Sequence, residues 1–167
     1  MKPVKKLTVS AVLTALCVLL LLLGSVIRNI QISFVAAAGL LPAVAVIHCG
    51  YGWAAGVYAA AGILSLFILP DKSCTVWFLI VFGHYGILKS LIEKTKSRVL
   101  EWVLKILLFC ACTAAIYFLF RSFFFGALPQ YAEWILFAVL PVCYVLYDIA
   151  FTALIAFYDK RIRPHVE

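Results

Sequence analysis

The chain is short of charge, and long parts of it carry none. Only 13% of its 167 residues are Asp, Glu, Lys or Arg, whereas 66% are hydrophobic, and the mean hydropathy is +1.13. No charged residue lies between positions 7 and 27, and none lies between 29 and 70. Soluble domains do not have this composition, so the sequence predicts a protein whose solvent is the lipid bilayer.

The chain also lacks the motifs of common enzyme classes. It has no phosphate-binding loop, no HExxH, no GxSxG and no paired acidic motif of a membrane transferase. We therefore predict that it is not an enzyme and needs no cofactor, and that any active transport needs a separate ATPase. Five of its six cysteines lie in apolar runs, and Cys110 and Cys112 lack the spacing of a zinc pair, so we predict no metal site.

Apolar runs and the breaks between them predict an all-α, polytopic membrane protein with six transmembrane helices in a single domain, residues 1–167. The first run, residues 7–27, is long enough as a helix to span ~31 Å, which matches the hydrocarbon core of a bilayer. The uncharged run 29–70 is too long for one span, and Gly50 and Gly52 divide it. The predicted helices cover about 7–27, 32–47, 51–69, 74–92, 102–120 and 133–158.

The basic residues predict the orientation of these helices. Six spans put both termini on one side, and eleven of the fourteen Lys and Arg residues fall on that side. Only Arg28, Lys72 and Arg121 fall on the other side, so we expect both termini in the cytoplasm and the chain in a bacterial plasma membrane. The basic residues flank apolar runs rather than line one face, which favours lipid headgroups over nucleic acid as partners of the net charge of +7.

Small residues mark two helix surfaces. Ala11 and Ala15 lie four apart on the first predicted helix and form a stripe that lets another backbone approach closely in lipid. We predict that this stripe docks a partner helix. Gly52, Gly56 and Ala60 form a similar ridge on the third predicted helix, and there we predict helix packing.

Two charged residues fall inside predicted spans. Asp148 lies ~22 Å down the sixth helix from its outer end, and Lys89 lies ~24 Å down the fourth. A carboxylate at that depth is costly unless it is paired, so we predict an ion pair between Lys89 and Asp148. The pair has two possible roles, a structural tie between the two helices and a proton or ion relay.

A ligand would enter from the outer side, where polar and aromatic residues gather. Aromatic rings stack on a flat solute and arginine pairs with a negative group, so the sequence offers candidate contacts for a small solute. The same residues would equally form an ordinary aromatic belt at the membrane interface. The candidates are Arg28, Asn29, Trp77, Arg121 and Trp134.

The sequence resembles the S components of energy-coupling-factor transporters, the membrane subunits that bind vitamins. The resemblance rests on chain length, six predicted spans with both ends inside, the opening segment 7–16 (LTVSAVLTAL) and a third helix rich in glycine and alanine. It implies that a small solute such as a vitamin enters from outside. It also implies that Ala11 and Ala15 meet the transmembrane T subunit, which two ATPase subunits drive.

The sequence is also similar to rod-shape-determining membrane protein D, a small six-span protein that scaffolds cell-wall synthesis. A scaffold of this kind would use the same small-residue stripes to hold partner helices, and it would transport nothing. The two functions predict different companions. An S component would copurify with a T subunit, ATPases and a small molecule, and a scaffold would copurify with proteins of wall synthesis.

Overall fold

The computed structural model describes residues 3–93, 98–123 and 130–161, and in the last two helices it describes the side chains of only some residues. Within these ranges the regular elements are helices, and there is no strand. The all-α class is therefore confirmed. The chain divides into two compact units, Met1–Glu101 and Trp102–Glu167. The single domain stays a prediction.

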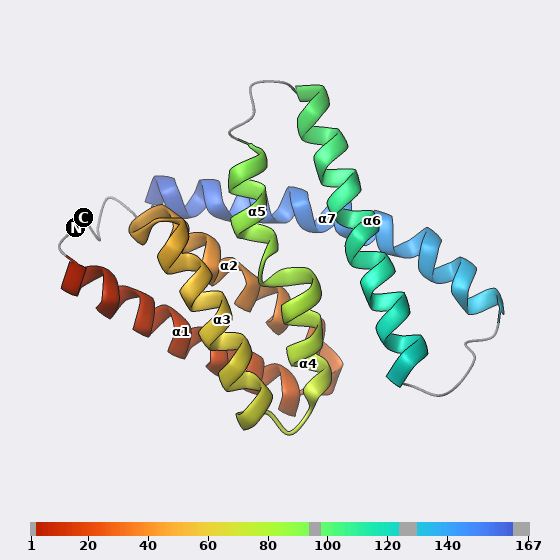
Figure 1. The fold of residues 1–167 in the computed structure, drawn as a ribbon, viewed down its shortest axis with the longest axis horizontal. Helices are drawn as coiled ribbons and strands as arrows, with labels where there is room; N and C mark the ends of the chain where they lie inside the picture. Colours follow the sequence, from red (N-terminus) through yellow and green to blue (C-terminus); the bar gives the residue numbers. More distant parts are fainter. Residues whose placement is uncertain (1–2, 94–97, 124–129, 162–167) are drawn as a thin grey trace. The chain divides into compact units, whose positions relative to one another are not determined.

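The first unit begins with three long helices that pack side by side, α1 (Pro3–Val26), α2 (Gln31–Cys49) and α3 (Tyr51–Ile68) (Figure 1). A single 3-10 turn, η1 (Arg28–Ile30), joins the first two. Gly50 joins α2 to α3 with a φ of 96°, a left-handed conformation that glycine adopts without steric cost. Small side chains let the helices approach, and Ala45, Ala54 and Val57 form a buried cluster.

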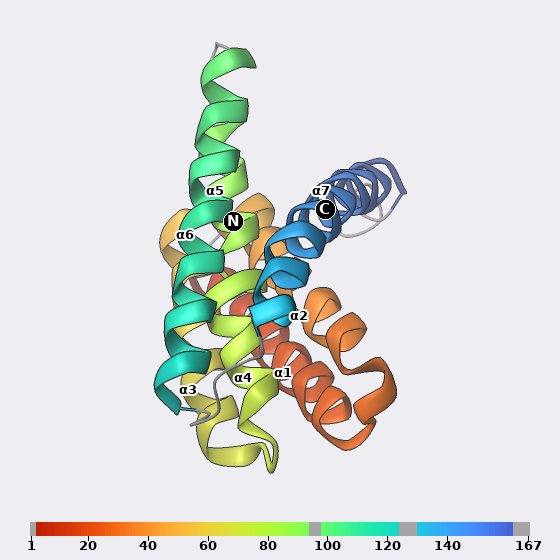
Figure 2. The same ribbon diagram turned by 90° about the vertical axis from the view of Figure 1, so that its right-hand side faces the viewer.

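The fourth predicted helix is interrupted. It consists of α4 (Lys72–Trp77), a π-helical turn η2 (Phe78–Phe82) and α5 (Tyr85–Ile92), which follow one another along one span (Figure 1). The predicted span over about 74–92 is present, and the π turn within it was not predicted. The turn that leads into α4 and the turn between α1 and α2 lie at the same end of the first unit, at the lower edge of both views (Figure 2).

Four segments are long and apolar enough to cross a membrane, namely Pro3–Val26, Arg28–Cys49, Tyr51–Ile68 and Lys72–Ile92. They agree in position with the first four predicted spans. The rest of the chain forms α6 (Arg98–Phe123) and α7 (Gln130–Arg161), where helices 102–120 and 133–158 were expected. The described part of α7 includes the apolar stretch Tyr144–Tyr158. These segments are those of a membrane protein, whereas six spans and cytoplasmic termini stay predictions.

Helix α2 approaches the π turn so closely that only glycine fits at one position. A Cβ built on Gly39 would lie 2.7 Å from the Phe82 carbonyl oxygen, which is a backbone atom rather than the end of a flexible side chain. Gly56 on α3 is the opposite case, because a Cβ built there has no described atom within 4 Å. A substitution of Gly39 therefore tests a steric clash, whereas a substitution of Gly56 tests helix propensity alone.

We predict that Gly39→Ala destabilises the protein by about 1–3 kcal/mol, because the added methyl group overpacks the contact with Phe82. Gly56→Ala is the matched control, and it should leave stability unchanged or raise it by up to about 1 kcal/mol through helix propensity. The free energy of unfolding in mixed detergent micelles measures both. Equal effects of the two substitutions would contradict the close approach.

Candidate functional site

Two spans of the first unit each lose a backbone hydrogen bond near the middle of their length. In the hydrocarbon region no water can replace such a bond, and an unsatisfied carbonyl costs several kcal/mol. Side chains from neighbouring helices make the replacement in both spans. The two carbonyls, together with the side chains that donate to them, define the candidate site.

In α2 the break comes from Pro42, which has no N–H to donate to the carbonyl of Ala38 one turn earlier. The Cys17 thiol of α1 donates to this oxygen instead, with a distance of 3.6 Å between Sγ and O. Cys17 and Ala38 are fully buried. A thiol is a weak donor, but here it donates to a carbonyl that has no backbone donor in its own helix.

In the fourth span the break is the π turn. The Gly83 N–H donates to the Phe78 carbonyl, five residues back, at an N-to-O distance of 2.7 Å. An α-helix would pair this N–H with the carbonyl of Leu79. The Leu79 oxygen instead accepts from the Tyr58 hydroxyl of α3 at 2.8 Å, and His84 Nδ1 lies 3.2 Å from the same oxygen. Because a carbonyl only accepts, Nδ1 carries the proton in this contact.

Aromatic rings enclose this contact. The ring centroid of Tyr58 lies 5.8 Å from that of Phe78 and 6.3 Å from that of His84, and the Tyr58 and His84 ring planes meet at 69°. Gly83 makes room for them, since a Cβ there would lie 2.8 Å from both the Tyr58 and the Phe78 rings. We call these residues, Tyr58, Phe78, Leu79, Gly83 and His84, the mid-span cluster.

The two breaks meet near the middle of the spans. Phe82 is ten residues from each end of the segment Lys72–Ile92, about 15 Å of helix in either direction. Gly39, which follows the freed carbonyl of Ala38, packs against Phe82. Interrupted helices that meet near the bilayer midplane commonly form the solute sites of transporters, and π turns are frequent at functional sites.

A second polar network ties the start of α2 to the start of α4. Gln31 Nε2 donates to Ser73 Oγ at 2.7 Å, and Ser73 Oγ donates to Asp71 Oδ1 at 2.7 Å. The Asp71 carboxylate also caps α4 by accepting from the Ser73 N–H at 2.9 Å. The hydroxyl and N–H of Ser73 hold the pKa of Asp71 below its ordinary value, and the positive charge of Arg28 lowers it further.

The predicted solute contacts fall partly at this end of the first unit. Arg28 and Asn29 are exposed on η1, and Trp77 is half-buried at the end of α4. Thr75 of α4 is fully buried, and its hydroxyl has no hydrogen-bond partner among the residues that the structure describes. The side chains of Arg121 and Trp134 lie outside the described residues, so their part in a site stays a prediction.

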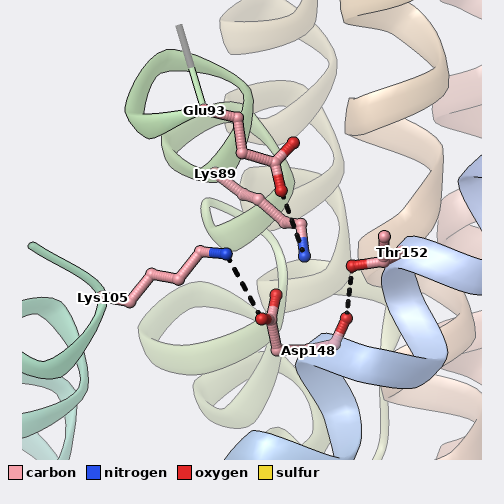
Figure 3. A network of polar contacts seen from close by, with 5 residues as sticks. All are labelled: Lys89, Glu93, Lys105, Asp148 and Thr152. Carbon is pink, nitrogen blue, oxygen red and sulfur yellow. Dashed lines mark hydrogen bonds and ion pairs between the residues drawn. The ribbon is translucent and has the colours of Figure 1, made fainter. Parts of the chain in front are cut away.

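Lys89 and Asp148, the predicted intramembrane pair, each have a charged partner in their own unit (Figure 3). Lys89 Nζ lies 3.5 Å from Oε1 of Glu93, the residue that follows α5, and Lys89 is only 4% exposed. Asp148 Oδ2 lies 3.4 Å from Lys105 Nζ of α6. A pair between Lys89 and Asp148 would join the two units, and it stays a prediction.

The alanine stripe of α1 is exposed. Ala11 and Ala15 both face away from the buried side of the helix, which carries Ser10, Cys17, Leu21 and Gly24. An exposed stripe of small residues fits the predicted docking surface. Docking itself stays a prediction.

The predicted ridge of α3 is not the surface by which this helix packs in its own unit. Gly52 and Gly56 are exposed, and Ala60 is half-buried. The helix buries a different set of residues, Ala54, Val57, Ala61, Gly62 and Ser65. Packing of the Gly52–Gly56–Ala60 ridge against another helix stays a prediction.

Sequence reasoning missed most of the mid-span cluster. The signal for the α2 break was present, because a proline always frees the carbonyl four residues earlier. Nothing in the apolar run Phe78–Phe82 marks a π turn, and nothing in the sequence pairs Tyr58 with Leu79. Lys105 was missed as the partner of Asp148 because it closes a run of charged residues that reads as a solvated connector.

Among the side chains that the structure describes, no three His, Cys, Asp or Glu residues gather closely enough to hold a metal ion. Comparison of the chain with models of protein families, with curated proteins and with solved structures finds no match. The function is therefore inferred from the residues themselves.

We predict a coupling energy of about 1–3 kcal/mol between Lys105 and Asp148 in a double-mutant cycle of Lys105→Met and Asp148→Asn. Each single change leaves a charge with little exposure, 13% for Lys105 and 19% for Asp148, without its partner. The free energy of unfolding of the four proteins measures it, and a coupling below about 0.5 kcal/mol would contradict the pair.

The matching cycle of Lys89→Met with Asp148→Asn tests the pair that the sequence predicts. A coupling as large as that of Lys105 would support an ion pair of Asp148 with Lys89. A coupling below about 0.5 kcal/mol would reject it.

Proposed function

We propose that the chain is the solute-binding membrane subunit of a transporter that separate ATPase subunits drive, in the plasma membrane of a bacterium. The observation that carries this proposal is the meeting of two interrupted spans at Gly39 and Phe82, beside the polar side chains of Tyr58 and His84. Where helices are interrupted, backbone carbonyls and polar side chains can exchange their partners for a solute without exposing any of them to lipid.

The proposed topology has six spans with both termini in the cytoplasm. The four segments of the first unit supply four spans, and α6 and α7 supply the other two. The bias of eleven basic residues against three favours this orientation. It would place Arg28 and the Gln31–Ser73–Asp71 network at the outer surface, where the solute enters. The buried hydroxyl of Thr75 is a group in that region that a solute or a water molecule can satisfy.

The proposed partner surface is the exposed stripe of Ala11 and Ala15. Without larger side chains, a second helix can approach the α1 backbone and gain packing contacts that lipid chains do not give. In the S components that the sequence resembles, this surface meets the T subunit. Two parts of the first unit thus have different functions in this proposal. The outer and middle parts bind the solute, and the N-terminal part of α1 contacts the partner subunit.

A scaffold similar to rod-shape-determining membrane protein D is the second candidate. The exposed Gly52 and Gly56 favour it, because a scaffold needs more than one surface for partner helices. The mid-span cluster favours the transporter instead, since interrupted spans that meet near the midplane commonly form solute sites. The two functions predict different complexes.

Purification of the native complex in mild detergent, with mass spectrometry of its proteins and small molecules, distinguishes them. The transporter function predicts a T subunit, ATPase subunits and a small molecule retained in a fixed ratio to the chain. Proteins of wall synthesis without a retained small molecule would contradict the transporter and support the scaffold.

We predict that Ala11→Leu combined with Ala15→Leu reduces recovery of the partner subunits at least about tenfold, since loss of about 1.4 kcal/mol of packing is enough for that change. The added side chains hold a neighbouring backbone away, whereas membrane insertion should be unchanged because leucine is more apolar than alanine. Quantitative mass spectrometry of the copurified proteins measures the effect.

Ala111→Leu combined with Ala115→Leu is the matched control. These two alanines have the same spacing and are also exposed, but they lie on α6. The control should recover the partners as the wild type does. Equal recovery with the α1 variant would show that the stripe of Ala11 and Ala15 faces lipid.

A further inference from the structure

The Leu79 carbonyl can accept a hydrogen bond from side chains next to it or from the Gly83 N–H, and in this structure it accepts from side chains. In the π turn it accepts from the Tyr58 hydroxyl at 2.8 Å and lies 3.2 Å from His84 Nδ1. The Gly83 N–H, its partner in an α-helix, donates to the Phe78 carbonyl at 2.7 Å. The Gly83 N–H therefore has an acceptor in either geometry, Phe78 in the π turn and Leu79 in an α turn.

We propose that η2 is a two-state hinge of the fourth span, and that the Tyr58 hydroxyl holds it in the π state. In the second state the Gly83 N–H bonds the Leu79 carbonyl, the turn is α-helical, and Tyr58 is released. The hinge is a property of the fold itself and does not depend on the proposed transport function.

The change of state moves α5 relative to α4. One residue of helical register corresponds to about 100° of rotation and about 1.5 Å of rise, so a π-to-α change shifts α5 by up to these amounts. The moving segment is short, and it carries the buried residues Tyr85, Gly86 and Lys89. A change at the middle of the span is thereby transmitted to Lys89 and its ion pair with Glu93 (Figure 3).

The surroundings of η2 suit a hinge. On one side the backbone of Gly39 packs against the Phe82 carbonyl, and on the other the absence of a side chain at Gly83 leaves room for the ring of Tyr58. The pattern of helical hydrogen bonds resumes at once, since the Leu88 N–H donates to the His84 carbonyl at 3.0 Å. The irregular region is thus confined to a few residues between two regular helices.

Nuclear magnetic resonance of the full chain in lipid nanodiscs tests the hinge. Labelling with 13C-carbonyl phenylalanine and 15N glycine selects the two Phe–Gly pairs of the sequence, at Gly83 and Gly126. We expect the Gly83 amide to exchange between two environments on the microsecond-to-millisecond timescale. Tyr58→Phe should shift the populations toward the second state about 3- to 20-fold, the effect of removing one hydrogen bond between membrane helices.

Thr14→Val is the matched control, because it removes a hydroxyl that donates to the Ser10 carbonyl at 2.8 Å within α1 and has no bond to the fourth span. It should leave Gly83 as in the wild type. Deletion of Ile80 removes one residue from the π turn and should give a single Gly83 environment without exchange. One exchange-free Gly83 signal, unchanged by Tyr58→Phe, would overturn the hinge, and so would equal responses to Tyr58→Phe and Thr14→Val.

Discussion

In a bilayer every backbone carbonyl must find its hydrogen-bond donor inside the protein, and this requirement shapes the first unit more than any other. Pro42 and the π turn each leave one carbonyl without its helical donor, and in each case a side chain of a neighbouring helix replaces it. The Cys17 thiol donates to the Ala38 carbonyl, and the Tyr58 hydroxyl donates to the Leu79 carbonyl. The irregular spans are therefore tied to α1 and α3 by specific bonds as well as by packing.

Small residues make these ties possible. The Tyr58 hydroxyl reaches Leu79 because Gly83 leaves space for its ring, and α2 reaches η2 because Gly39 has no side chain. In lipid the helices gain little from burying apolar surface, so close approach and specific hydrogen bonds must supply the association energy. The same reasoning gives meaning to the small residues that stay exposed, Ala11, Ala15, Gly52 and Gly56, as surfaces for helices outside the first unit.

Composition and local patterning were enough to predict the helices, but contacts between residues far apart in the chain were not predictable. The first three helices agree with prediction to within a few residues, because runs without charge locate them and Gly50 separates the second from the third. The interruption of the fourth span was missed, because Phe78–Phe82 is as apolar as its surroundings and its π geometry depends on Tyr58, about twenty residues earlier. Pro42 in a helix indicates a carbonyl without its backbone donor. That Cys17 is the replacement donor follows only from the packing of α1 on α2.

Both proposals depend on the two interrupted spans. In the first, the mid-span cluster offers a solute site, and in the second, the π turn lets the fourth span change shape. Electron cryomicroscopy of the chain in a lipid nanodisc, bound to a rigid antibody fragment for size, tests this basis most directly. The account predicts the Gly83 nitrogen within hydrogen-bond distance of the Phe78 oxygen, and the Tyr58 hydroxyl on the Leu79 oxygen. A continuous α-helix from Lys72 to Ile92 as the sole conformation, with the Gly83 N–H bonded to Leu79, would contradict it.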